Sequence, residues 1–106
     1  MPEALLVMTT MPDENSANAL AAQLVERGLA ACVNIGAPTT SVYRWEEQLK
    51  QDTERLLTIK TTVDRYAALE DVIVERHPYE LPELIAVPIT HGLSAYLAWI
   101  EQCTRN

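Results

Sequence analysis

Apolar and polar positions follow two different periods along the chain and divide it into strands and helices. Residues 4–8 form a continuous apolar run, which is typical of a strand covered on both faces. Apolar residues then recur at helical spacing between Asp13, a candidate N-cap that follows Pro12, and Gly28, a residue type common just past a helix end. The pattern predicts a first strand followed by a first helix.

The middle of the chain predicts a long hairpin. Leu29, Ala31, Val33 and Ile35 recur at every second position, and the strand resumes after Gly36-Ala37-Pro38 and runs to Trp45. Residues 55–61 form the next strand, with Leu57 and Ile59 on one face. We expect the polar stretch between these two strands to turn the chain back.

The last third predicts a helix, a strand and a final helix. The second helix is expected to begin at Thr62, as N-cap, and to end before Pro78. Residues 84–90 are apolar throughout and predict a fourth strand, which Pro88 places at a sheet edge. Ser94 could cap the last helix. The buried stripe expected on that helix comprises Tyr96, Leu97, Ile100 and Cys103.

This order of elements defines the fold class. Two strand–helix units joined by a hairpin are typical of an α+β, ferredoxin-like βαββαβ sandwich, here with a C-terminal helix. We therefore expect an antiparallel sheet with strand order 4-1-3-2. The length of 106 residues suits a single domain over residues 1–106.

Two features of this pattern predict self-association. In this architecture both crossover helices cover the same sheet face, yet the first and fourth strands are apolar on both faces. The hairpin strands are also much longer than the other two and would overhang the sheet. Long unpaired edges are normally protected by pairing with another chain, so we expect a homo-oligomer.

Charge and cysteine content narrow the functional classes. Fifteen acidic against eight basic residues give a net charge of −7, and the bases are scattered, which argues against nucleic-acid or anionic-membrane partners. No apolar run approaches the ~20 residues of a membrane helix, and the first residues lack the pattern of a secretory signal. Cys32 and Cys103 lie in apolar surroundings without metal-finger spacing, so we expect reduced thiols and a cytoplasmic protein.

The densest group of chemically active side chains is the segment 77–83, His-Pro-Tyr-Glu-Leu-Pro-Glu. Its two prolines stiffen a loop that carries one imidazole, one phenol and two carboxylates. One interpretation is a binding edge with His77 as metal ligand or proton acceptor. The alternative is a rigid connection in which His77 caps the preceding helix electrostatically.

Three further residues are candidates for a ligand cleft. Trp45, near the hairpin tip, could line a cleft or fill a subunit interface, and its residue type favours the interface. Lys60 is expected to point away from the face of Leu57 and Ile59, and Glu54 on the same strand face could pair with it across subunits. The alternative for both charges is a solvated sheet face.

No pattern in the sequence supports catalysis. GxSxG, HExxH and glycine-rich phosphate-loop motifs are absent, and the chain has only three glycines. The acids around the hairpin tip are typical of a solvated turn, so we assign no metal ligands there. We expect a non-enzymatic protein without an organic cofactor.

Several segments together resemble the CutA family of divalent-cation tolerance proteins. They are TTMPDE, LAACVNI, VYRW before an acidic hairpin, IKTT, HPYELPEL and YLAWI, in family order over essentially the whole chain. The resemblance implies a tight homotrimer assembled through long hairpin strands, similar to PII signalling proteins, and a role in copper and divalent-metal tolerance without an established reaction.

The resemblance also implies site residues. Trp45, Lys60, Tyr79 and Glu83 match family motif positions, so with Glu54 they are the residues expected to line a ligand cleft between subunits. The copper ligands proposed for bacterial members are a cysteine at the end of the first strand and two adjacent histidines before the proline. Thr9 and Arg76 occupy the first two of these positions here, which leaves His77 as the expected ligand for Cu²⁺ or another divalent metal.

Two hypotheses follow, from different functional classes. The first is a metal-binding tolerance trimer that uses His77 and nearby carboxylates, which the acidic hairpin favours. The second is a PII-like signalling or adaptor trimer that binds a small anionic ligand or a protein in the cleft, which Lys60 and Arg44 favour.

Overall fold

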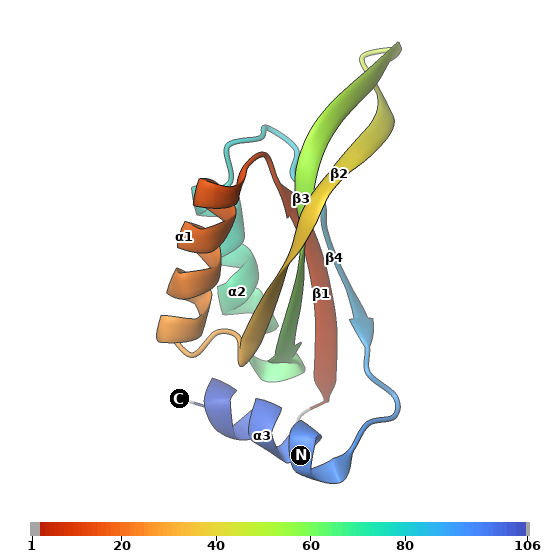
Figure 1. Cartoon of the computed structure of the whole chain (residues 1–106). Helices are drawn as coiled ribbons and strands as arrows, with labels where there is room; N and C mark the ends of the chain where they lie inside the picture. Colours follow the sequence, from red (N-terminus) through yellow and green to blue (C-terminus); the bar gives the residue numbers. More distant parts are fainter. Residues whose placement is uncertain (1–2, 106) are drawn as a thin grey trace.

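The computed structural model describes residues 3–105, which form a four-stranded antiparallel sheet and three helices (Figure 1). The elements in chain order are β1 (Ala4–Met11), α1 (Glu14–Glu26), β2 (Cys32–Trp45), β3 (Gln48–Thr62), α2 (Val63–Arg76), β4 (Leu84–Pro88) and α3 (Ser94–Thr104). The strand order β2-β3-β1-β4 is the predicted 4-1-3-2 order counted from the opposite edge. The expected fold class is therefore confirmed.

Helices α1 and α2 cover one face of the sheet, and α3 lies across the end opposite the hairpin tip (Figure 1). The apolar core fills the space between these helices and the sheet. Its fully buried members include Val7, Leu24, Leu57, Ile59, Leu69 and Ile73. No helix within residues 3–105 is long and apolar enough to cross a membrane.

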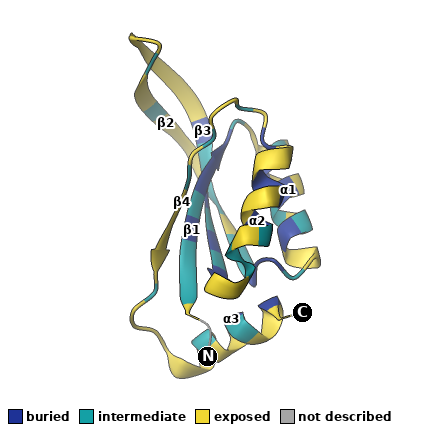
Figure 2. Cartoon of the chain, turned by 180° about the vertical axis from the view of Figure 1, so that it is seen from behind, coloured by how far each residue is buried: buried dark blue, intermediate teal, exposed yellow. Residues whose placement is uncertain are grey.

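The described part of the chain places no helix over the second face of the sheet (Figures 1 and 2). Ile85 and Val87 of β4 lie on this face beside Met8 and Leu6 of β1, and their exposed fractions are 51% and 44%. This arrangement agrees with the expectation for β1 and β4. Both faces of these strands are apolar, and the chain itself covers only one of them.

The hairpin turn differs from the prediction. We expected a polar stretch between Trp45 and a strand beginning at Arg55, but β3 begins at Gln48 and pairs with β2 up to Trp45. Only Glu46 and Glu47 turn the chain, with φ of 51° and 67°. The prediction was wrong because this part of the hairpin has no core to face. Backbone pairing continues there without the apolar alternation that indicates a strand.

The hairpin bends where it leaves the sheet. A β-bulge lies between Ile35 and Pro38, and such bulges bend and twist the strand that carries them. Gly36 lies within it, where a Cβ would meet the Leu56 carbonyl oxygen at 3.2 Å. The outer half of the hairpin therefore projects beyond β1 and β4 (Figure 1). This agrees with the overhang expected from the length of the two hairpin strands.

Element boundaries were predicted with mixed success. Asp13 caps α1, and its carboxylate accepts the Ser16 N–H at 2.7 Å. Thr62 occupies the N-cap position of α2 but makes no side-chain capping bond. Ser94 is the first residue of α3 rather than its cap, which is Leu93. The last strand ends at Pro88 rather than at Thr90, although the Ile89 N–H still donates to the Ala4 carbonyl at 2.9 Å.

The stripe predicted for α3 is only partly buried. Ile100 is fully buried, but Cys103 is exposed and Tyr96 is 41% exposed. The reason is that α3 packs across the end of the sheet, where it contacts β1 and β3 (Figure 1). Thr104 is buried instead, and its hydroxyl donates to the Ile100 carbonyl at 2.8 Å.

Candidate functional site

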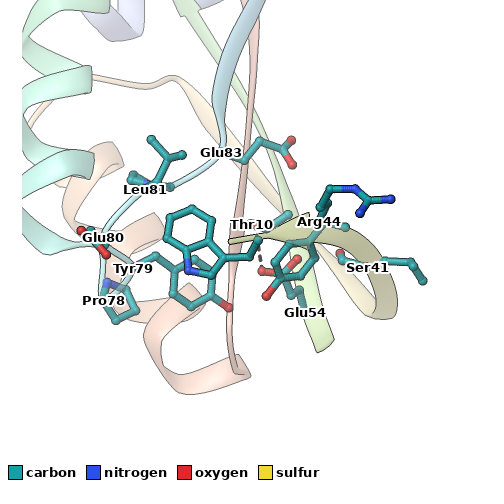
Figure 3. Close-up of a pocket in the computed structure, with 13 residues that line it drawn as sticks. Thr10, Ser41, Arg44, Glu54, Pro78, Tyr79, Glu80, Leu81 and Glu83 are labelled. Carbon is teal, nitrogen blue, oxygen red and sulfur yellow. Dashed lines mark hydrogen bonds between the residues drawn. The ribbon is translucent and has the colours of Figure 1, made fainter. Parts of the chain in front are cut away.

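A cavity of about 850 Å³ lies between the outer half of the hairpin and the connection from α2 to β4 (Figure 3). We call it the hairpin pocket. The residues that line it are Thr10, Ser41, Val42, Tyr43, Arg44, Trp45, Glu54, Pro78, Tyr79, Glu80, Leu81, Pro82 and Glu83. Its volume lies in the range of roughly 300–1,000 Å³ that is common for small-molecule sites.

The α2–β4 connection is held against the end of β1 by His77. This residue is only 8% exposed, and its ring Nδ1 accepts the Tyr79 N–H at 3.1 Å. That bond assigns the ring proton to Nε2, which donates to the Thr10 carbonyl at 2.6 Å. Both ring nitrogens are therefore engaged by the backbone, and His77 positions Tyr79 beside the pocket.

A second bond fixes the other end of the same connection. The hydroxyl of Thr9, which is fully buried, donates to the Glu83 carbonyl at 2.6 Å. Thr9 stands at the position where the resemblance implies a copper-ligating cysteine. In this chain that position therefore holds backbone in place.

Glu54 is the buried charge of the hairpin pocket. Its carboxylate accepts the Thr10 hydroxyl at 3.2 Å (Figure 3). The Tyr79 hydroxyl also bonds to this carboxylate. Burial, the hydrogen bond to Glu54 and the charges of Glu54 and Asp52 raise the pKa of Tyr79 to about 12. Tyr79 is therefore a neutral hydrogen-bond donor at physiological pH.

A second phenol–carboxylate pair lies farther out on the hairpin. The Tyr43 hydroxyl donates to the Asp52 carboxylate across the β2–β3 ladder. This bond, with burial and the negative charges of Asp52 and Glu54, raises the pKa of Tyr43. The pairing holds the Tyr43 ring in place at the pocket wall.

The structure brings together most of the predicted cleft residues. Trp45, Glu54, Tyr79 and Glu83 all line the hairpin pocket, whereas Lys60 and His77 do not. Lys60 lies on the face opposite Leu57 and Ile59, as predicted, and its ammonium donates to the Asn34 side chain. Lys60 is six residues from Glu54 along β3, or about 20 Å at the usual strand rise, so the two do not meet within one chain.

Sequence reasoning missed Thr10 and did not assign Tyr43 to the cleft. Tyr43 shares a strand face with Trp45, so residue spacing could have included it. Thr10 could not be found this way, because its contact with Glu54 depends on the β1–β3 register, in which Thr10 lies opposite Leu56.

The residues implied as copper ligands do not fit a metal centre in this conformation. His77 has no free ring nitrogen, Thr9 bonds to a carbonyl, and Arg76 is an exposed cation. Within residues 3–105 no three His, Cys, Asp or Glu side chains are grouped so that they could hold a metal ion.

The raised pKa of Tyr79 predicts a loss of stability at alkaline pH. Because the folded-state pKa lies above the ordinary value of 10, the contribution is intact below pH 10 and is lost as pH rises through about 12. We expect Tyr79→Phe to lower the free energy of unfolding at pH 8 by about 1 kcal/mol and to reduce its decline between pH 10 and 12.

Urea unfolding at stepped pH values checks this prediction, with Tyr96→Phe on α3 as the matched control. Parallel decline of wild type and Tyr79→Phe between pH 10 and 12 would contradict the assigned Tyr79–Glu54 contact.

Fold and site together define a small ferredoxin-like α+β protein that carries a ligand-sized pocket beside an overhanging hairpin. The model of the family described as "CutA1 divalent ion tolerance protein" matches residues 5–103. The chain belongs to this family of tolerance proteins.

Individual relatives match this chain over nearly its full length. The divalent-cation tolerance protein CutA of Salmonella newport is 43% identical over 105 residues, which are 99% of this chain and 91% of that protein. The crystal structure of CutA1 from a psychrotrophic Shewanella matches with a TM-score of 0.95 at 43% identity and covers 99% of this chain and 98% of its own. For the divalent cation tolerance protein of Thermus thermophilus the TM-score is 0.94 at 41% identity, with coverage of 96% and 99%.

Proposed function

We propose that this chain acts in divalent-cation tolerance as a homotrimeric, non-enzymatic binding protein whose working site is the hairpin pocket. The observation that carries the proposal is the buried Glu54 carboxylate, held by Thr10 and Tyr79 in a cavity of about 850 Å³. A carboxylate held away from water is costly unless it is paired, so an unpaired one in a preformed cavity favours a role in recognition.

The trimer is supported by the uncovered sheet face and by the overhanging hairpin, both of which a neighbouring copy would cover. An ion pair between Glu54 of one chain and Lys60 of another across such an interface is the competing use of this carboxylate, because a Glu54 paired in this way is not free to bind a ligand. A cytoplasmic location is supported by the unpaired thiols of Cys32 and Cys103.

A second candidate is direct binding of Cu²⁺ or another divalent metal with His77 as ligand. The family's description favours it, and so do Glu80 and Glu83, whose carboxylates lie in the same connection as His77. Coordination would require the ring to release either the Thr10 carbonyl or the Tyr79 N–H. With one imidazole nitrogen and oxygen ligands, the affinity for Cu²⁺ should be micromolar at best.

A Cu²⁺ titration of wild type and His77→Ala by calorimetry separates the two candidates. Because both His77 nitrogens are engaged, we expect His77→Ala to keep the Cu²⁺ affinity of wild type within about twofold while losing about 2 kcal/mol of stability from two hydrogen bonds. His91→Ala is the matched control, since His91 is exposed and bonds only to the neighbouring Thr90. Loss of Cu²⁺ binding in His77→Ala alone would favour the metal site and overturn the structural role of His77.

A further inference from the structure

The size of the hairpin pocket indicates an organic ligand rather than a bare ion. A cavity of about 850 Å³ exceeds by far the volume of one ion. The described residues also offer no group of three metal-ligating side chains. The pocket is instead lined by three aromatic residues, Tyr43, Trp45 and Tyr79, together with apolar and carboxylate side chains.

The charge of the pocket selects the sign of that ligand. Glu54 is only 7% exposed, and both groups that bond to its carboxylate, the hydroxyls of Thr10 and Tyr79, are neutral. No ion pair of Glu54 is present within residues 3–105. Buried charges are usually paired, so a cation that enters the pocket gains a partner already freed from most of its water.

The other charged residues that line the pocket also favour a cationic ligand. Glu80 and Glu83 add two carboxylates, against a single guanidinium from Arg44. In Figure 3 the Arg44 guanidinium points away from Glu54 and Tyr79. A small anion would therefore meet uncompensated negative charge in the centre of the pocket.

The aromatic side chains add a second source of selectivity. The faces of Trp and Tyr rings attract cations, and rings around a carboxylate are a recurring solution for substituted ammonium groups. Tyr43 is held by its bond to Asp52, and Tyr79 by its bond to Glu54 and by the His77 ring at 4.8 Å between centroids. The pocket walls on both sides are thus positioned before a ligand arrives.

From this geometry we propose that the hairpin pocket binds an organic cation of the substituted-ammonium class, with Glu54 as counter-charge and the rings of Tyr43, Trp45 and Tyr79 as walls. The inference rests on the proposed function, because it names the class of ligand for the same pocket. It favours a cation over the anion that Lys60 and Arg44 led us to consider from the sequence.

Choline is the probe that tests it, titrated at constant ionic strength and followed by calorimetry and by Trp fluorescence. The matched ligand is its uncharged isostere, in which a tert-butyl group replaces the trimethylammonium. We expect choline to bind wild type at least about tenfold more tightly than the isostere, because the isostere gains neither the carboxylate nor the cation–π attraction. Equal affinity for the two ligands would overturn the proposal.

Variants locate the effect within the pocket. We expect Glu54→Gln and Trp45→Leu each to weaken choline binding at least about tenfold, while Tyr96→Leu on α3 leaves it unchanged. Glu54→Gln keeps the shape of the side chain, and a melting curve for each variant confirms that it is folded. Unchanged choline affinity in Glu54→Gln would refute the role of this carboxylate.

A titration with succinate, a small anion, shows whether a negative result for choline concerns the class of ligand or the pocket itself. Trp45-dependent binding of succinate without choline binding would overturn the cation proposal and leave the proposed binding function in place. If neither ligand binds to wild type, both the cation proposal and the small-molecule function of the pocket are overturned.

Discussion

Replacing Ile59 by proline should prevent the chain from folding or lower its stability by well over ~3 kcal/mol. Ile59 is fully buried in β3, opposite Val7 of β1 on one side and Val33 of β2 on the other. Proline removes the N–H from this central ladder, and its ring does not fit a paired interior strand. The expected loss is a large part of the roughly 5–15 kcal/mol that is typical of a whole domain. Circular dichroism and urea unfolding measure it.

Two other substitutions separate the backbone effect from the lost side chain. Ile59→Val should cost about 0.5–1.5 kcal/mol and Ile59→Ala about 2–5 kcal/mol, since both keep the backbone N–H. We expect the order Pro, Ala, Val from most to least destabilising. If Ile59→Pro melts like Ile59→Ala, the ladder around Ile59 contributes nothing and β3 is not the central strand.

The fold could be predicted because the periodic segments face a core. In α1, apolar spacing and the Asp13 cap agree, and the structure places both as expected. The hairpin shows the limit of this reasoning. Its outer half packs against no apolar core in the single chain, so apolar alternation is missing although β2 and β3 remain paired as far as Trp45 and Gln48.

The site was predictable only where sequence neighbours form it. The segment 77–83 was singled out by its composition, and it does form one wall of the hairpin pocket. The role of His77 within that wall could not be predicted, because it depends on the Thr10 carbonyl, 67 residues away in the chain. The Glu54–Tyr79 contact likewise arises from the bend of the hairpin over the α2–β4 connection, which residue spacing does not encode.

The second large effect that we expect concerns the assembly of the chain into a trimer. Light scattering coupled to size exclusion should find a mass near three times the chain's 11.9 kDa at micromolar concentration. The reason is the uncovered sheet face with Ile85 and Val87, together with hairpin residues such as Leu49, which is 75% exposed in the single chain. A surface of this kind is normally covered by another copy.

Val87→Asp should reduce that mass to the chain's own, because a carboxylate buried between copies without a partner costs several kcal/mol at each interface. Val74→Asp is the matched control, since Val74 is 56% exposed on α2, the helix that covers the opposite face of the sheet. It introduces the same charge at a site that a partner on the open face would not reach, so the oligomer should persist. A wild-type mass near 11.9 kDa, or equal dissociation by both variants, would show that the open face is not the contact between copies.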